Sequence, residues 1–257
     1  MSRVLPIADS WNIPPGSLER PLIIAHRGDV ESAPENTLEA FLGALEKGAD
    51  GVEMDVRLTK EGRVVVMHDR RIDRTTNGKG PVGTHTLAEL KSLDAGFWFD
   101  PKFKEAAVPT LDEAFEALPS DFLMVVELKV RGWGVKPLVS GTVEVIRRFK
   151  RWESTLVTSF NPVALLVLRL MEPNIRRGYI WSAQHPLPIR QRWLSPMAKP
   201  NWMDPDLKTF TPKVLKHFHR QGKPVLAWDE DAGRDLERLG AMRLDGIVTD
   251  HLTGLVG

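Results

Sequence analysis

The sequence is most constrained by short apolar runs that end abruptly in polar residues, a pattern repeated along the chain. Ile23-Ile24-Ala25 is followed at once by His26-Arg27-Gly28. Similar endings occur at three later places: Glu53-Met54-Asp55, Met67-His68-Asp69 and Glu127-Leu128-Lys129. Apolar runs this short are typical of buried strands, and a parallel barrel collects the carboxyl ends of its strands at one mouth. The pattern therefore predicts a barrel whose site is built from distant segments.

The order of the expected elements favours the same architecture. Strand-like runs occupy residues 22–25, 51–58, 122–129, 155–158, 176–181, 201–203, 225–228 and 246–249. Helical spacing lies between them, at about 36–48, 110–118, 137–150, 162–171, 212–221 and 231–239. Asn36, followed by Glu39, is expected to cap the first of these helices rather than to act as a ligand. Eight strands that alternate with helices predict a single TIM, or (β/α)8, barrel domain over residues 1–257.

Two stretches depart from this alternation. Lys60-Glu61-Gly62 leads from the strand at 51–58 into Arg63–His68, and so short a connection requires an antiparallel hairpin. The hairpin brings His68 opposite the Glu53–Asp55 segment. Residues 70–109 are rich in turn signals, and we expect them to form a small insertion after the second barrel strand, packed on itself beside the mouth.

Length, charge and composition exclude several classes of binding partner and site. At 257 residues the chain suits one large domain, and a formal net charge of +1 argues against a nucleic-acid partner. The absence of cysteine removes disulfides and thiolate metal sites. The longest apolar run, Val163–Leu168, is far too short for a transmembrane segment. We expect a cytoplasmic protein that acts on a small molecule, and the sequence leaves its oligomeric state open.

Three strand-end carboxylates are the candidate metal ligands: Glu53, Asp55 and Glu127. Buried together without a cation, they would repel one another and take up protons. Oxygen ligands favour one hard divalent ion, Mg²⁺ or Ca²⁺, over Zn²⁺. The alternative is a set of rim carboxylates paired with Arg or Lys. Two histidines beside the cluster favour the metal site.

The other candidate site residues lie around these carboxylates. His26 and His68 are adjacent to the cluster, and imidazoles that titrate near neutrality can serve as acid and base in one reaction. Arg27 and Lys129 suit a phosphate group, with charge balance for the carboxylates as the alternative reading. Phe160 and Trp228 stand at strand ends and are candidates for the wall of a substrate pocket, or for core packing.

A series of short motifs runs in order from about residue 22 to 250. They are His26-Arg27-Gly28, Pro34-Glu35-Asn36-Thr37, Glu53-Met54-Asp55-Val56, His68-Asp69, Asp73-Arg74-Thr75-Thr76-Asn77-Gly78, Pro109-Thr110-Leu111, Glu127-Leu128-Lys129 and Asp245-Gly246-Ile247-Val248-Thr249-Asp250. Together they resemble the glycerophosphodiester phosphodiesterase family. The resemblance implies a TIM barrel with an insertion after its second strand, and metal-dependent hydrolysis of glycerophosphodiesters to glycerol 3-phosphate and an alcohol.

Carried onto this sequence, the resemblance implies an acid–base pair in His26 and His68, a metal site in the three carboxylates, and phosphate contacts from Arg27 and Lys129. The later part of the chain departs from the family pattern. Trp228 is followed by Asp229-Glu230-Asp231 where the family often has Thr-Val-Asn, and Trp202-Met203-Asp204-Pro205 replaces a Leu-His-Pro-like segment.

These departures leave the leaving alcohol open. We expect the proline-rich segment 185–205, with Trp193 and Trp202, to influence leaving-group selectivity. Two alternative functions remain: a lysophospholipase D-like phosphodiesterase that acts on acylated substrates, and a non-catalytic barrel that binds a phosphate ligand. A pure binding protein has no need of an acid–base pair, which argues against the second.

Overall fold

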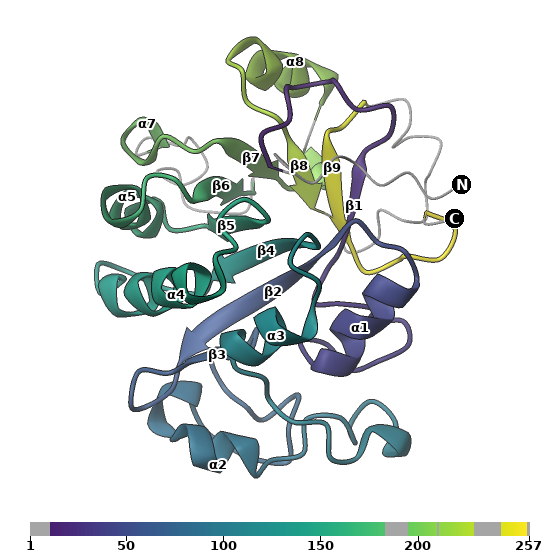
Figure 1. Ribbon diagram of the computed structural model, residues 1–257, viewed down its shortest axis with the longest axis vertical. Helices are drawn as coiled ribbons and strands as arrows, with labels where there is room; N and C mark the ends of the chain where they lie inside the picture. The colour runs from purple at the N-terminus through teal and green to yellow at the C-terminus, as the bar shows by residue number, and fades with distance from the viewer. Residues whose placement is uncertain (1–10, 183–194, 210, 229–242, 256–257) are drawn as a thin grey trace.

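The computed structural model describes residues 11–182, 195–209, 211–228 and 243–255. Its barrel strands are β1 (Leu22–Ala25), β2 (Gly51–Leu58), β4 (Leu123–Leu128), β5 (Thr155–Ser159), β6 (Arg176–Trp181), β7 (Trp202–Pro205), β8 (Leu226–Trp228) and β9 (Gly246–Thr249). They follow the order β7-β6-β5-β4-β2-β1-β9-β8, each parallel to its neighbour. Parallel bridges Met203–Val225 and Asp206–Trp228 join β7 to β8 and close the ring. The predicted TIM barrel is confirmed (Figure 1).

Helices cover the outside of the strands, as Figure 1 shows for α4 and α5. They are α1 (Leu38–Glu46), α3 (Leu111–Ala117), α4 (Lys136–Phe149), α5 (Pro162–Met171), α7 (Ser195–Ala198) and α8 (Pro212–Arg220), with a 3-10 turn at η4 (Leu207–Thr209). Side-chain oxygens of Thr110, Asn161 and Thr211 accept hydrogen bonds from the first turns of α3, α5 and α8, which fixes where these helices begin. The helix predicted at 231–239 and residues 185–194 of segment 185–205, including Trp193, lie outside the described residues.

The barrel interior has an apolar floor. Trp11, Leu22, Ile24, Leu123, Val125, Leu156, Trp202, Leu226 and Val248 form one buried cluster. These residues come from opposite sides of the ring, so they meet only inside the barrel. The rings of Trp11 and Trp202 stand edge to face with centroids 5.1 Å apart, and the Trp202 indole N–H donates to the Trp11 carbonyl at 2.9 Å.

The position of Trp202 corrects one prediction. We expected this residue to influence selectivity at the mouth, but it is the first residue of β7 and is fully buried in the floor. The amino ends of the strands point away from the mouth of a parallel barrel, so Trp202 acts on stability.

A polar layer lies directly above this floor. Successive side chains of a strand point to opposite faces, so the residue two positions after each floor residue also faces the interior. For six strands this next residue is His26, Glu127, Thr158, Asp204, Trp228 or Asp250. The change from floor to polar layer places chemically active groups inside the carboxyl half of the barrel.

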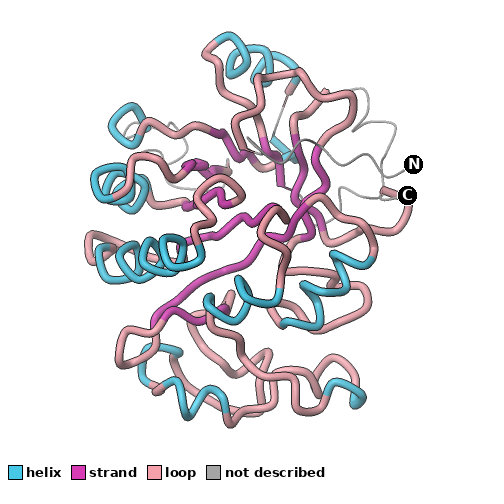
Figure 2. Tube along the Cα trace, in the orientation of Figure 1, coloured by secondary structure: helices cyan, strands magenta, loops and turns pink. Residues whose placement is uncertain are grey.

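Residues after β2 form the expected hairpin. Strand β3 (Val64–Val66) pairs antiparallel with β2, and the Met67 N–H donates to the Asp55 carbonyl at 2.8 Å. Segment 70–109 follows, with η2 (Val82–Thr84), α2 (Leu87–Lys91) and η3 (Pro101–Phe103) joined by loops (Figure 2). It shares a hydrophobic cluster with β3 that comprises Val65, Met67, Ile72, Val82, Leu90, Ala95 and Val108.

Across the described part of the chain, every helix is too short or too polar to cross a membrane.

We predict that Trp202→Ala lowers the free energy of unfolding by about 3–5 kcal/mol, because it removes a fully buried indole from the barrel floor. Trp152→Ala is the matched control. Trp152 is 37% exposed, so its loss should cost no more than about 1 kcal/mol. Urea unfolding of the two variants beside the parent protein measures both values, and equal losses would contradict the assignment of Trp202 to the floor.

Candidate active site

Three carboxylates meet at the carboxyl half of the barrel. Glu53 and Asp55 lie on β2, and Glu127 lies opposite Asp55 on the neighbouring strand β4. One oxygen from each lies within 4.8 Å of the others, and the residues are 5%, 0% and 8% exposed. Such a buried set of oxygen donors can hold a metal ion.

The electrostatics of this cluster favour a bound cation. Burial raises the pKa of Glu53 well above its usual range, and the charges of Asp55 and Glu127 raise it further. Burial also raises the pKa of Glu127, against the attraction of Lys129. Burial alone would raise the pKa of Asp55, but Lys129 and Arg27 lower it below its usual range. A divalent ion bound to these oxygens would offset both the cost of burial and the repulsion between the carboxylates. The three residues therefore suit a divalent metal ion.

Two cations of the chain contact the same carboxylates. Lys129 Nζ lies 3.0 Å from Asp55 Oδ1 and 2.8 Å from Glu127 Oε2. Arg27 Nε lies 3.3 Å from Asp55 Oδ2. The structure therefore contains the charge balance that the sequence offered as the alternative role of Arg27 and Lys129. An incoming anion would meet both groups at the same place, so this role is compatible with phosphate binding.

A tight turn after β1 sets the position of Arg27. Its backbone lies in the left-handed region at φ 57°, and its N–H donates to Glu53 Oε2 at 3.2 Å. Gly28 follows at φ 91°, where a Cβ would come 2.6 Å from the backbone of Ala40. Only glycine fits this approach to α1, which explains the glycine of the His-Arg-Gly motif.

Asn36 has a role that the sequence did not predict. We expected it to cap the helix that follows, but Thr37 caps α1 by accepting from the Ala40 N–H at 3.3 Å. Asn36 instead lies at φ 58°, donates through Nδ2 to Asp55 Oδ2 at 2.8 Å, and accepts from the Asp55 N–H at 3.2 Å. It therefore holds one candidate metal ligand in place. The one feature of the sequence that pointed to a role at the site was the position of Asn36 within the Pro34–Thr37 motif.

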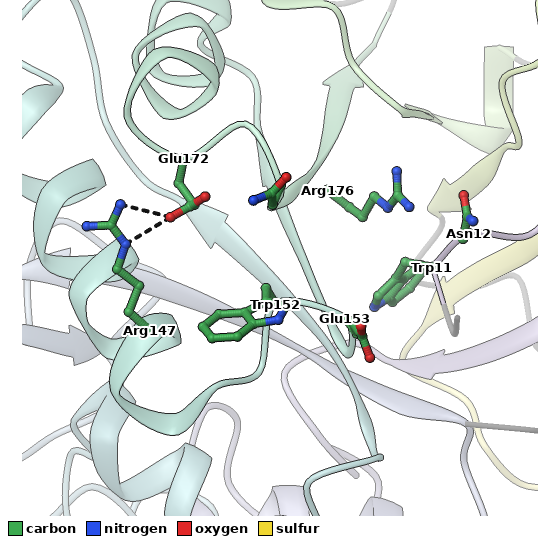
Figure 3. Close-up of a pocket in the computed structure, with 8 residues that line it drawn as sticks. Trp11, Asn12, Arg147, Trp152, Glu153, Glu172 and Arg176 are labelled. Atoms are coloured by element: carbon green, nitrogen blue, oxygen red, sulfur yellow. Dashed lines mark hydrogen bonds and ion pairs between the residues drawn. The ribbon is translucent and has the colours of Figure 1, made fainter. Parts of the chain in front are cut away.

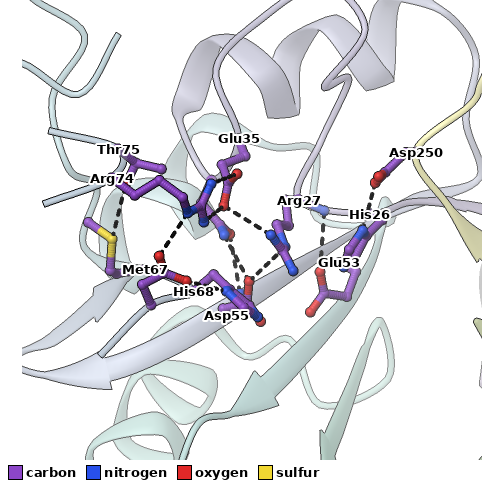
Figure 4. Close-up of polar contacts among 12 residues, drawn as sticks. His26, Arg27, Glu35, Glu53, Asp55, Met67, His68, Arg74, Thr75 and Asp250 are labelled. Atoms are coloured by element: carbon purple, nitrogen blue, oxygen red, sulfur yellow. Dashed lines mark hydrogen bonds and ion pairs between the residues drawn. The ribbon is translucent and has the colours of Figure 1, made fainter. Parts of the chain in front are cut away.

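Each candidate histidine is oriented by a carboxylate (Figure 4). His26 Nδ1 lies 2.6 Å from Asp250 Oδ1, and His68 Nδ1 lies 2.7 Å from Asp69 Oδ1. An ionised carboxylate only accepts hydrogen bonds, so Nδ1 of each ring carries the proton. In a neutral ring, Nε2 is then the basic nitrogen. Both aspartates stand in the sequence motifs, but their function as partners depends on the fold.

His68 is held from both sides. The Arg74 guanidinium lowers the pKa of Asp69 to about 2, with His68 adding to the effect, so this partner stays ionised. Arg74 also pairs with Glu35 at 2.6 Å. Arg57 donates through Nε to the His68 carbonyl at 2.9 Å and through Nη1 to the Lys129 carbonyl at 3.3 Å. Arg57 carries no signal in the sequence, because its role is to tie two backbone segments together.

The charge on His68 is set by its surroundings. Burial lowers the pKa of the imidazole, Asp55 opposes this, and the positive charges of Lys129 and Arg27 reinforce it. The net pKa lies below its ordinary value, which favours the neutral ring at neutral pH.

Phe160 and Trp228 meet inside the barrel. Their ring centroids lie 6.2 Å apart at an interplanar angle of 83°. Strands β5 and β8 are separated in the sheet by β6 and β7, so the two rings face each other across the interior. The two side chains therefore contact each other across the interior, above the apolar floor.

A separate pocket of about 460 Å³ lies at the other end of the barrel (Figure 3). Its lining includes Glu153 and Asn174, which precede β5 and β6, beside an ion pair of 2.8 Å between Arg147 and Glu172. The candidate metal ligands and histidines all lie at the opposite end, so this pocket is not the site described above.

Comparisons with known proteins agree with this geometry. The model of the glycerophosphoryl diester phosphodiesterase family matches residues 26–253. A glycerophosphodiester phosphodiesterase from Caldanaerobacter subterraneus subsp. tengcongensis is 37% identical over 238 residues, which cover 91% of this chain and 96% of the relative.

Solved structures give the same result. An Oleispira antarctica phosphodiesterase in complex with the product sn-glycerol-3-phosphate matches with a TM-score of 0.81 at 32% identity, covering 90% of this chain and 93% of that one. A glycerophosphodiester phosphodiesterase from Agrobacterium tumefaciens matches with a TM-score of 0.77 at 29% identity, covering 90% and 97%.

Proposed function

The chain belongs to the glycerophosphoryl diester phosphodiesterase family, and from this premise we propose that it hydrolyses glycerophosphodiesters to glycerol 3-phosphate and an alcohol. The observation that carries the proposal is the convergence of three buried carboxylates, two cationic side chains and two carboxylate-oriented histidines at one end of the barrel. A non-catalytic phosphate-binding barrel would need the cations but not the paired histidines.

Glu53, Asp55 and Glu127 would hold one divalent ion, Mg²⁺ or Ca²⁺. When bound, the ion supplies positive charge to the phosphoryl oxygens. Arg27 and Lys129 contact the phosphate from the chain itself and stabilise the charge that accumulates on it in the transition state. Lys129 is well suited to this, since its Nζ lies 3.0 Å from Asp55 Oδ1 and 2.8 Å from Glu127 Oε2.

The two histidines divide the proton transfers. Neutral His68 accepts a proton from the nucleophile at Nε2, consistent with its lowered pKa. His26, oriented by Asp250, donates a proton to the departing alkoxide. Phe160 and Trp228 form the wall against which the organic part of the substrate packs.

The nucleophile is the substrate's own hydroxyl on the carbon beside the esterified oxygen. His68 takes its proton, the hydroxyl oxygen forms a bond to phosphorus, and the bond from phosphorus to the leaving oxygen breaks as His26 protonates that oxygen. Water then opens the cyclic glycerol phosphate: His26 takes a proton from water and His68 returns one to the 2-oxygen. Both rings end in their starting states. Intramolecular attack gains the entropic advantage of proximity, which can be worth about 7–11 kcal/mol when the geometry is right.

One observation favours the acylated substrates of the alternative reading. Trp133, in the loop after β4, is 83% exposed, and this loop leaves the carboxyl end of a barrel strand. An exposed indole near the mouth is a suitable contact for an acyl chain. We therefore include lysophosphatidylcholine beside glycerophosphocholine in the substrate panel.

We predict that the protein releases glycerol 3-phosphate from glycerophosphocholine, that EDTA abolishes the activity, and that Mg²⁺ or Ca²⁺ restores it. Three converging carboxylates need a hard cation to bind a phosphate anion beside them. An enzyme-coupled assay of glycerol 3-phosphate with and without chelator measures this. An assay of released choline compares glycerophosphocholine with lysophosphatidylcholine, because choline is the product that the two substrates share. Full activity in a metal-stripped sample would refute the metal assignment, and faster turnover of lysophosphatidylcholine would identify the acylated substrate as preferred.

Replacement of either histidine should remove the acid or the base. We predict that His26→Ala and His68→Ala each lower kcat by roughly a hundredfold or more, the usual contribution of a positioned acid or base. His217→Ala is the control, because His217 is exposed on α8 and should leave kcat unchanged. Steady-state kinetics with circular dichroism as a folding check measure the effect. Near-normal kcat in either variant would show that the histidine is not catalytic.

The cyclic route requires a particular hydroxyl. We predict that a glycerophosphodiester analogue with hydrogen in place of the 2-hydroxyl is hydrolysed at least about a hundredfold more slowly than the parent, because the intramolecular nucleophile is gone. Its affinity as a competitive inhibitor is the control for binding. Hydrolysis of the analogue at the parent rate would eliminate the cyclic mechanism and leave direct attack by water.

A further inference from the structure

Asp204 is a buried acid in the polar layer that the proposed chemistry does not use. It lies on β7, two residues after Trp202 of the floor, and faces the barrel interior with Glu127 and Trp228. The residue is 3% exposed. Its neighbour on β6 is Ile180, which offers the carboxyl no polar partner from its side chain.

Three polar atoms of the polar layer, on the side formed by β5, β7 and β8, have no hydrogen-bond partner in the described part of the chain. Asp204 Oδ1, Thr158 Oγ1 and Trp228 Nε1 are all buried, and none has a hydrogen-bond partner within the described part of the chain. Buried polar groups are nearly always hydrogen-bonded, and leaving one unpaired costs about 1–3 kcal/mol. Three such atoms on the inward faces of β5, β7 and β8 indicate that this side of the interior accepts a polar ligand group.

We propose that Asp204 is a specificity-determining residue that binds the terminal hydroxyl of the glycerol half of the substrate. This inference rests on the proposed diester hydrolysis. Glycerol is the half common to all glycerophosphodiesters, so it suits a fixed and buried partner. The neighbouring 2-hydroxyl is the proposed nucleophile, which leaves the terminal hydroxyl for Asp204.

The chemistry of the carboxyl selects a hydroxyl over an anion or a cation. Burial raises the pKa of Asp204 well above its usual range, and the charge of Glu127 adds to this. A carboxyl accepts a hydrogen bond from a hydroxyl in either protonation state, and when protonated it also donates one. The phosphate has its own partners in Arg27 and Lys129, on the side of the interior formed by β1, β2 and β4.

The test combines protein variants with substrate analogues. Asp204→Leu removes the polar atoms, Asp204→Ala removes them without adding bulk, and Asp204→Asn keeps a carbonyl acceptor and supplies an NH2 donor group. Each is assayed on glycerophosphoethanolamine and on the analogue that lacks the terminal hydroxyl. Calorimetry with glycerol 3-phosphate and with inorganic phosphate measures the same contact without turnover.

We expect Asp204→Leu and Asp204→Ala to lower kcat/KM on glycerophosphoethanolamine about tenfold or more, mainly through KM. On the analogue that lacks the terminal hydroxyl, kcat/KM should not change. Asp204→Asn should stay within about threefold of the parent protein. Glycerol 3-phosphate should bind about tenfold more weakly to the Leu and Ala variants, with inorganic phosphate unchanged.

Equal losses of kcat/KM on glycerophosphoethanolamine and on the analogue, or no loss on either substrate, would overturn the assignment of Asp204. The Ala and Asn variants keep the test valid if Asp204→Leu does not fold. A parent protein that hydrolyses neither diester would refute the proposed function, and the comparison of glycerol 3-phosphate with inorganic phosphate would still test Asp204 separately.

Discussion

The mutual repulsion of three buried carboxylates is the constraint on which the rest of this site depends. Glu53, Asp55 and Glu127 are held within 4.8 Å of one another in a place where burial alone would protonate them. The surrounding groups work against this: Lys129 and Arg27 supply positive charge, and Asn36 donates to Asp55. Carboxylates held this close together would repel a phosphate unless positive charge lay beside them. Arg27 and Lys129 supply that charge, and the proposed phosphate would contact the same two side chains.

The barrel supplies this arrangement through the two-residue period of its strands. An apolar floor that includes Trp11 and Trp202 occupies the amino end of the interior, and the next inward positions carry polar groups. The floor residues are at most 5% exposed and tie the strands together, so the side chains above them are held by rigid elements. Stability and chemistry are thereby assigned to opposite ends of the same strands, as in parallel barrels generally.

The sequence was most informative where one strong local signal decides the structure. Apolar runs with polar ends predicted Leu22–Ala25, Gly51–Leu58 and Gly246–Thr249 with the bounds that the structure has. Prediction failed where a side chain had two plausible local roles. Asn36 was read as a cap because Asn caps helices, but the left-handed backbone there and its bonds to Asp55 come from tertiary contacts. Trp202 was expected at the mouth but lies in the floor. The level of a short strand within a barrel depends on its register with its neighbours, which only the fold reveals.

The polar layer is divided in a way that bears on substrate recognition. The charged groups on or directly after β1, β2, β4 and β9 lie beside the cluster of carboxylates and cations. On β5, β7 and β8, the layer instead presents a hydroxyl, a carboxyl with a raised pKa and an indole N–H, beside the aromatic pair Phe160 and Trp228. A phosphodiester has the same division, with a charged phosphorus centre and neutral organic groups that carry hydroxyls. The interior therefore matches the proposed substrate in both charge and polarity. Under this proposal the phosphate lies on the side of β1, β2 and β4, and the organic groups lie on the side of β5, β7 and β8, where their hydroxyls can pair with buried polar groups.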